Sequence, residues 1–188
     1  MLVTCVSDLH GFLPQLEGGD LLIVAGDLTA RDDLQEHVRF QTWLHDQNYR
    51  KKVVIGGNHD NRFEKLGLIS VRQQYEEMGE DYLCDSGTEF EGLKIWGSPH
   101  SLLFPGINPK CCAFTGTEND LKKKYDLIPL GIDILILHSA AYGILDENIY
   151  GEHCGSKSLL EAVQRIKPRL VVHGHIHEQG SKIKRVYL

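Results

Sequence analysis

The sequence of 188 residues predicts an α/β protein in which two mixed β-sheets pack together and helices flank them. Short runs of Val, Leu and Ile alternate with loops and helical patterns in the first and last thirds of the chain. The middle third holds short β runs between turn residues, which is typical of hairpins. We find no linker, internal repeat or low-complexity segment, so we expect one domain over residues 1–188.

The first half predicts two helices between its strands. Residues 32–47 contain no Gly or Pro, and Asp32 or Asp33 can cap their first turn. Residues 69–78 predict a second helix that ends at Gly79. The strand-like runs of this half are Leu2–Val6, Leu21–Ala25 and Val53–Ile55.

The second half begins with turn-punctuated β runs that predict antiparallel hairpins, and the proline-bearing residues 98–109 are expected to be irregular. Thr117 and Asp120 predict a capped helix over residues 117–125. The hairpin runs are Tyr82–Cys84, Thr88–Phe90 and Leu93–Gly97. The remaining expected elements are a strand at 132–137, a long loop at 139–155, a helix at 156–167 and strands at 170–172 and 182–187.

Polar clusters follow five of the strand-like runs, at the point where each run ends. They are Asp8-Leu9-His10, Gly26-Asp27, Gly57-Asn58-His59-Asp60, His138 and Gly174-His175-Ile176-His177. Because open α/β sheets bind ligands beyond the carboxyl ends of their strands, we expect these clusters to meet. Carboxylates, a carboxamide and imidazoles together are typical of a transition-metal site with nitrogen and oxygen donors. In an extended segment, His175 and His177 point to the same side and can both reach one metal cluster.

Composition limits the other classes of function. The net charge of −6 argues against a long nucleic acid as the main partner, although bound cations would still admit small phosphate esters. The five cysteines show no CxxC spacing and are expected to be free thiols in a reducing compartment. The N-terminus begins as a strand, without a basic leader or a long apolar stretch. We therefore expect a cytoplasmic protein without a membrane partner.

The five clusters resemble the five motifs of the calcineurin-like metallophosphoesterase superfamily. Four further segments are similar to the branch of metallophosphoesterase-domain-containing proteins related to class III cyclic-nucleotide phosphodiesterases. They are Trp96-Gly97-Ser98-Pro99, residues 133–138, Tyr142-Gly143-Ile144-Leu145-Asp146 and residues 173–178. The resemblance covers nearly the whole chain and implies a four-layer αββα sandwich that binds two metal ions.

The resemblance also implies roles for seven ligands. One metal would take Asp8, His10 and His177, the other would take Asn58, His138 and His175, and Asp27 would bridge the two. Mn is the leading candidate for both ions, and Fe, Zn, Ni and Co also suit imidazole and carboxylate donors. Two cations about 3.5–4 Å apart can hold a shared hydroxide for in-line attack at phosphorus.

His59 is the expected catalytic residue, because the family histidine at this position faces the substrate and can protonate the departing oxygen. Asp60 has two open roles, either orienting the His59 ring or capping its own loop. His173 is not expected to be a ligand. Whether His100, His153 and Arg31 border the substrate or lie on the surface is also open.

The function expected from this resemblance is a dinuclear phosphodiesterase for small nucleotide-type diesters, including cyclic nucleotides. The alternatives are a phosphomonoesterase or broad-specificity phosphatase, and a noncatalytic metal-binding scaffold for protein interactions. The loop Leu28-Thr29-Ala30-Arg31 lacks the Asp-Arg-Gly of Ser/Thr protein phosphatases, and the third motif ends in Asp60 in place of Glu. Ser139-Ala140-Ala141 stands where the branch has Gly-Pro-Pro, which leaves substrate preference open but not metal binding. Oligomeric state is also open.

Overall fold

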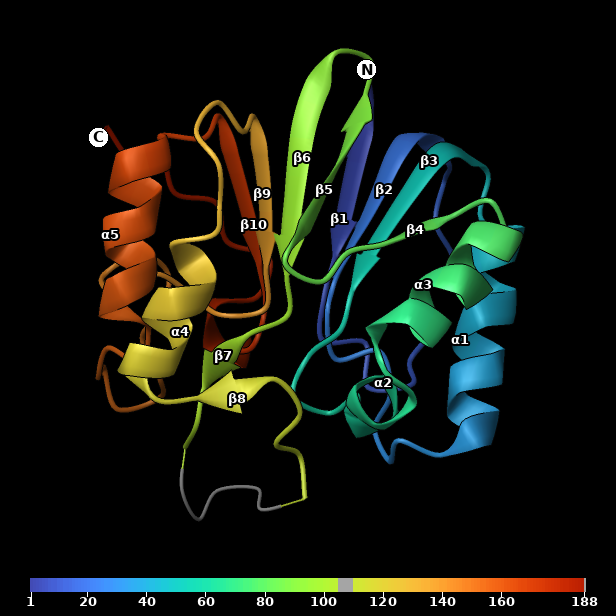
Figure 1. Ribbon diagram of the computed structural model, residues 1–188, viewed down its shortest axis with the longest axis horizontal. Coiled ribbons are helices and arrows are strands. Elements are labelled where there is room, and N and C mark those ends of the chain that lie inside the picture. Colours follow the sequence, from blue (N-terminus) through green and yellow to red (C-terminus); the bar gives the residue numbers. More distant parts are fainter. Residues whose placement is uncertain (105–109, 188) are drawn as a thin grey trace.

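A computed structural model describes residues 1–104 and 110–187, and two four-stranded sheets form its centre (Figure 1). The first sheet is parallel throughout and has the order β1 (Val3–Val6), β2 (Gly19–Ala25), β3 (Tyr49–Ile55), β4 (Asp81–Tyr82). The second has the order β10 (Leu170–His173), β9 (Ile134–Leu137), β6 (Leu93–Ser98), β5 (Ser86–Phe90). It is mixed, because β5 runs antiparallel to β6 while β6, β9 and β10 are parallel.

Helices cover the outer face of each sheet, which gives four layers (Figure 1). The helices α1 (Leu34–Asp46), α2 (Asn61–Leu66) and α3 (Leu68–Glu77) lie against the first sheet, and α4 (Glu118–Tyr125) and α5 (Lys157–Ile166) lie against the second. The strands β7 (Ser101–Leu102) and β8 (Thr115–Gly116) form a small parallel pair, and a 3₁₀ turn η1 covers His177–Gln179. The described residues contain no helix with the length and apolar content needed to cross a bilayer.

The core has three apolar layers that follow from this stacking. Leu21 and Ile23 of β2 face the second sheet and pack with Ile95 and Ile136. Leu22 and Val24, on the other side of the same strand, pack with residues of α1 and α3. A strand that is buried on both faces needs apolar residues at consecutive positions, which explains the continuous Leu-Leu-Ile-Val run of β2.

The predicted helix starts are confirmed. The Asp33 carboxylate accepts a hydrogen bond from the Glu36 N–H at the start of α1. Thr117 and Asp120 form a reciprocal capping box at the start of α4, and Ser156 caps α5. These caps satisfy backbone N–H groups that have no partner within the helix.

Several predicted elements differ in the structure. The hairpin of β5 and β6 is confirmed, but the run at 82–84 does not pair with β5, because β4 joins β3 in the first sheet. Residues 182–187 form no strand and are exposed, with Ile183 99% exposed. The segment expected to be irregular contributes β7, and its residues 105–109 lie outside the described part. The short helix α2 was not predicted.

Candidate metal centre

The polar clusters gather beyond the carboxyl ends of strands from both sheets. The clusters after β1, β2 and β3 come from the first sheet, and those after β9 and β10 come from the second (Figure 1). Within each sheet the carboxyl ends of these parallel strands share one edge, and contacts such as Asn58 to His138 and His175 to Asp8 bring the two edges together. The two expected groups of metal ligands lie on either side of Asp27.

Asp8, His10 and His177 form one group. The His10 Nε2 atom lies 3.2 Å from His177 Nε2, which in turn lies 3.5 Å from an Asp8 carboxylate oxygen. The backbone N–H of His175 donates to Asp8 Oδ1 over 2.8 Å, and the Ser7 hydroxyl donates to Oδ2 over 2.6 Å. These bonds fix the carboxylate where it faces the two imidazoles.

Asn58, His138 and His175 form the second group. The Nε2 atom of His138 lies 2.9 Å from the Asn58 side-chain oxygen, and its ring centroid lies 5.0 Å from that of His175. The Nδ1 atom of His138 lies 3.0 Å from the carbonyl oxygen of Ala25, so a proton on Nδ1 leaves Nε2 as the ligand atom.

Asp27 lies between the groups and is almost fully buried. Its Oδ1 is 3.2 Å from His138 Nε2, and its Oδ2 is 3.7 Å from His10 Nε2. One oxygen therefore faces each group, which is the arrangement that a bridging carboxylate needs. The backbone N–H of His59 donates to Oδ1 and holds the carboxylate in this orientation.

The electrostatics of the cluster favour ionised carboxylates. Burial raises the pKa of Asp27, but the charge and hydrogen bond of His138 outweigh it and hold that pKa at about 2. Burial also opposes ionisation of Asp8, yet its bonds with His177 and Ser7 and the charge of His138 leave its pKa well below the usual value. Burial lowers the pKa of His175 to about 4, which keeps this imidazole neutral.

The donor set fits a cation. Burial lowers the pKa of His138, but the charges of Asp27 and Asp8 overcome it and raise this pKa to about 9. With Nδ1 bonded to Ala25, the Nε2 lone pair would face oxygen lone pairs of Asn58 and Asp27 unless a proton or metal ion lies there. Ionised carboxylates, neutral imidazoles and an amide oxygen are suitable ligands for divalent transition metals.

The backbone around these side chains is under strain. Asp8, His10, Asp27 and His175 all adopt positive φ angles, of 52°, 44°, 52° and 73°. Non-glycine residues in this region cost of order 1–3 kcal/mol each, and such strain concentrates at functional sites. The turn at His175 also corrects the expectation of an extended 175–177 segment, because His175 contacts the His138 group while His177 contacts the Asp8 group.

Two motif glycines allow the loops to approach the carboxylates. A Cβ atom on Gly57 would lie 2.3 Å from Asp27 Oδ1, and one on Gly174 would lie 2.4 Å from Asp8 Oδ2. Both distances are far below van der Waals contact, so a side chain at either position would displace a carboxylate. The sequence identified these glycines as motif members without showing which groups they approach.

Comparison with known proteins identifies the fold family. The family model described as calcineurin-like phosphoesterase matches residues 1–179. The chain belongs to this family. It is 34% identical to a UPF0046 protein of Caenorhabditis elegans, over 93% of this chain and 68% of that protein. It is 35% identical to human metallophosphoesterase domain-containing protein 1, over 93% of this chain and 60% of that protein.

The predicted superfamily, its metallophosphoesterase-domain-containing branch and the αββα fold are thereby confirmed. A solved crystal structure also matches, with a TM-score of 0.69 at 13% identity over 93% of this chain and 83% of the other, which shows the fold alone. This phosphoesterase chain spans 60–68% of the length of the two named relatives. The family and the ligand clusters together indicate a metal-dependent phosphoester hydrolase.

His59 lies beside the predicted centre of this phosphoesterase. Its Nε2 atom is 4.0 Å from Asp27 Oδ2, and its ring packs edge-on against His10 with centroids 4.5 Å apart. Its Nδ1 atom is 3.4 Å from the Ala30 carbonyl oxygen and 3.4 Å from Cys111 Sγ. Cys111 was expected to be only a free thiol, and no spacing in the sequence places it against this ring.

Asp60 contacts backbone and not the His59 ring. Its two carboxylate oxygens accept hydrogen bonds from the N–H groups of Leu28, Thr29 and Gly57 and from the Thr29 hydroxyl. Burial and the nearby charge of Asp27 raise the pKa of Asp60 to about 7. The four bonds join the loops that carry Asp27 and Asn58, which favours the loop-capping role over the orienting one.

The other sequence candidates lie apart from the ligand groups. His100 bonds with Asp85 and the Phe114 carbonyl oxygen and lines a different cavity. His153 bonds with the buried carboxylate of Asp146. Arg31 is exposed, and His173 does not belong to any of the ligand clusters found among the described residues.

A cavity of about 320 Å³ opens over the second ligand group. Its described lining combines Asn58, His175 and His177 with the apolar side chains of Leu102, Leu103, Phe104 and Ile176. The Phe104 ring stacks on His175 with centroids 5.7 Å apart. Phe104 was not predicted, because an isolated aromatic residue in a proline-bearing segment gives no functional signal.

Proposed function

We propose that the chain hydrolyses small phosphodiesters of the nucleotide type, with two divalent transition-metal ions as cofactors. Asp8, His10 and His177 would hold one ion, Asn58, His138 and His175 the other, and Asp27 both. The observation that carries the proposal is the position of His59, which is not one of the seven proposed ligands although its ring lies beside the predicted bridging carboxylate and within 4.8 Å of ligand atoms of His10 and Asp27. From there the imidazole could reach the departing oxygen of a substrate bound at the metals.

The residues of the chain perform separable tasks in this proposal. Bound divalent cations supply Lewis-acid activation of water and of the phosphoryl oxygens. Asp60 holds the two ligand loops in register through the backbone of Leu28, Thr29 and Gly57. The Ala30 carbonyl oxygen favours a proton on Nδ1 of His59, and Nε2 faces Asp27, so the doubly protonated ring could give its Nε2 proton to the departing oxygen and become the neutral Nδ1–H form.

The cavity supports a diester over a monoester. None of its described lining residues is Lys or Arg, and Glu178 adds a carboxylate. A dianionic monoester gains from nearby guanidinium or ammonium groups, whereas a monoanionic diester needs them less. Leu102, Leu103 and Phe104 also offer an apolar surface for a second ester substituent such as a nucleobase. Hydrolysis of cyclic nucleotides is the specific form of this proposal.

Mn is the cofactor proposed first, with Fe, Zn, Ni and Co as alternatives that the same donors accept. The cytoplasmic location and the absence of membrane and long nucleic-acid partners stay predictions. Cys5, Cys84, Cys112 and Cys154 form no disulfide in the structure, and the reducing compartment stays a prediction. Oligomeric state is left to experiment.

The test is a substrate panel run on chelated and reloaded protein. A phosphodiester, a phosphomonoester and a cyclic nucleotide are each assayed with Mn, Ni, Zn and Mg, alongside Asp27→Ala as the inactive control. We expect the diesters to be hydrolysed fastest and only after reloading. Faster monoester hydrolysis would establish the phosphatase alternative. No hydrolysis of any substrate by metal-loaded protein would favour the noncatalytic scaffold.

A further inference from the structure

A second group of metal-binding side chains lies outside the centre described above. The Sγ of Cys84, a carboxylate oxygen of Asp85 and a ring nitrogen of His100 all lie within 4.8 Å of one another. Cys84 and Asp85 follow β4 of the first sheet, and His100 follows β6 of the second. The three residues therefore meet where the chain crosses between the sheets. None of them belongs to the proposed catalytic centre.

We propose that Cys84, Asp85 and His100 form a separate structural site for a thiophilic divalent cation of the Zn²⁺ class. Cysteine thiolate, imidazole and carboxylate are the ligands that Zn²⁺ takes in proteins. A thiolate ligand also distinguishes this site from the seven nitrogen and oxygen ligands of the proposed catalytic centre. Water or the Glu64 carboxylate, which lines the same cavity, completes the coordination.

The hydrogen bonds of His100 and Asp85 orient both side chains as a metal site would require. The Nδ1 of His100 bonds with the Phe114 carbonyl oxygen at 3.1 Å, which directs Nε2 toward Asp85 at 3.0 Å. The Ser98 hydroxyl donates to the other carboxylate oxygen of Asp85 over 2.8 Å. Metal-binding histidines and carboxylates are held in this way by backbone carbonyls and hydroxyls. Both ligands are thus oriented before an ion arrives.

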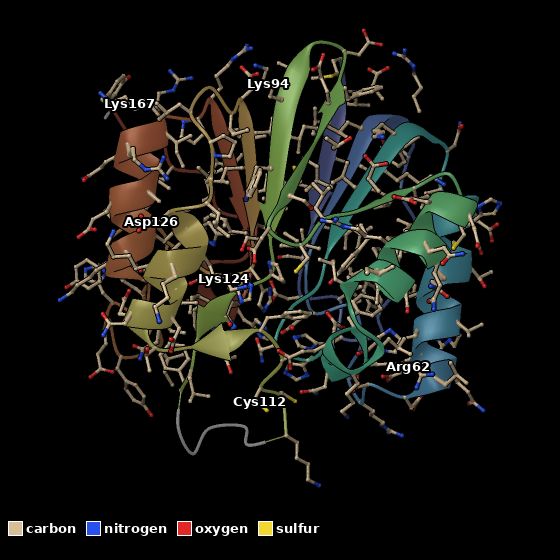
Figure 2. The ribbon with its side chains drawn as sticks, viewed as in Figure 1. Arg62, Lys94, Cys112, Lys124, Asp126 and Lys167 are labelled. Carbon is tan, nitrogen blue, oxygen red and sulfur yellow. The ribbon has the colours of Figure 1, made fainter. Side chains whose placement is uncertain are left out.

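The site also has a route of entry for an ion, and the positive charge of a lysine already lies beside it. A cavity of about 490 Å³ reaches all three ligands and is lined by Lys124 as well. Lys124 extends from α4 toward the middle of the molecule (Figure 2), and its ammonium lies 3.0 Å from the same Asp85 oxygen that faces His100. The ammonium therefore already places a positive charge beside Asp85, where we propose that the metal ion binds. Because the Lys124 side chain is 42% exposed, it can withdraw when a metal ion binds.

An ion at this site would stabilise the loop that carries Asn58 without contacting the proposed catalytic ligands. His100 is joined to the carbonyl of Phe114, and the neighbouring Ala113 N–H donates to the carbonyl oxygen of Asn58. Binding would thus fix the segment that supports Asn58 while leaving the proposed catalytic ligands untouched. On binding, the Cys84 thiol would release its proton to solvent and coordinate as thiolate.

The first test uses Co²⁺ as the probe in a chain with serine at positions 111, 112 and 154. These substitutions remove the sulfur atoms of Cys111 and Cys154, which line the cavity of about 320 Å³, and of the neighbouring Cys112, which contacts Asn61. We expect a thiolate-to-cobalt charge-transfer band equivalent to one ion per chain. Cys84→Ser should abolish the band, while the matched Cys5→Ser should keep it. A band that persists without Cys84, or that never appears, would overturn the proposal.

The second test needs no variant and so does not depend on how a substitution folds. The alkylation rate of each cysteine in the full chain is measured by mass spectrometry, with and without Zn²⁺. We expect Zn²⁺ to slow the alkylation of Cys84 by about tenfold, because a metal-bound thiolate is withdrawn from reaction, and to leave the alkylation rate of Cys5 unchanged. Equal rates for Cys84 in both conditions would show that the cluster is only an ion pair with Lys124. Lys124→Met should strengthen Zn²⁺ binding, because it removes the competing ammonium, and weaker binding would also count against the site.

Discussion

The side-chain oxygen of Asn58 lies 2.9 Å from the Nε2 atom of His138, although the two residues are 80 positions apart. Asn58 follows β3 of the first sheet and His138 follows β9 of the second. His177 likewise follows β10 of the second sheet while Asp8 and His10 follow β1 of the first, so both proposed ligand groups exist only where the two sheets pack together. The apolar layer between the sheets, with Ile23 and Ile136 at its centre, consequently determines the geometry of the ligands.

Replacement of Asp27 by Ala should remove metal from both positions. Each carboxylate oxygen faces a different ligand group, so neither group keeps a complete set of donors. We expect the metal content to fall from about two ions per chain to below one. Elemental analysis of the dialysed protein gives the measurement, with Asp33→Ala at the start of α1 as the control for loss of a carboxylate. Two tightly held ions in Asp27→Ala would mean that another residue bridges them.

The strand ends and the motif order were predictable because each depends on local sequence. An apolar run buried on both faces indicates a strand of a covered parallel sheet, as in β2, and the polar residues that follow it must lie at the sheet edge. The residues of both proposed ligand groups lie around Asp27 for the same reason, and their role as metal ligands stays a prediction. Caps such as Thr117 with Asp120 were predictable from a four-residue pattern.

Features that depend on tertiary contacts were not predictable. The run Tyr82–Cys84 was predicted to be one arm of a hairpin. In the structure β4 packs against α3 and pairs with β3, which places it in the first sheet. The positive φ of His175 separates it from His177, and no spacing rule reveals such a turn at a non-glycine residue. Likewise, three of the four hydrogen bonds of Asp60 come from Leu28 and Thr29, which lie 31–32 residues away, so the sequence left its loop-capping role as one of two options.

Asp60→Asn should test the role of this carboxylate. Its two oxygens accept four hydrogen bonds, and an amide would direct its N–H₂ group at one set of those donors. We expect the free energy of unfolding to fall by about 2–3 kcal/mol, as measured with urea. The pH profile of turnover should keep its shape, since the described hydrogen bonds of the Asp60 carboxylate come from Leu28, Thr29 and Gly57 and not from the His59 ring. A shifted profile at unchanged stability would restore the orienting role.

Glu118 should stabilise the fold in a pH-dependent way. Burial opposes its ionisation, but bonds from Ser158, Lys157 and Ser156 at the start of α5 outweigh burial and lower the pKa of Glu118 below its usual 4.5. A lowered folded-state pKa stabilises the protein above pH 4.5, and that contribution is lost as the pH falls through the folded-state pKa.

Glu118→Gln should therefore cost about 1 kcal/mol at pH 7, and the difference from the parent chain should shrink below about pH 4.5. Urea unfolding at a series of pH values measures it. Glu161→Gln, an exposed position on α5, serves as the matched control and should have little effect at any pH. A cost for Glu118→Gln that stays constant down to pH 3 would show that the carboxylate charge contributes nothing.

His59→Ala should separate proton transfer from metal binding. The ring lies beside Asp27 but is not one of the seven proposed ligands, so metal content should stay at the parent level. We expect kcat to fall by about 10²–10⁴-fold for a diester with a poor leaving group. The loss should shrink for a nitrophenyl ester, because a good leaving group departs without protonation. The exposed His45→Ala on α1 is the control and should leave kcat unchanged. An equal loss for both leaving groups would assign His59 to substrate positioning in place of acid catalysis.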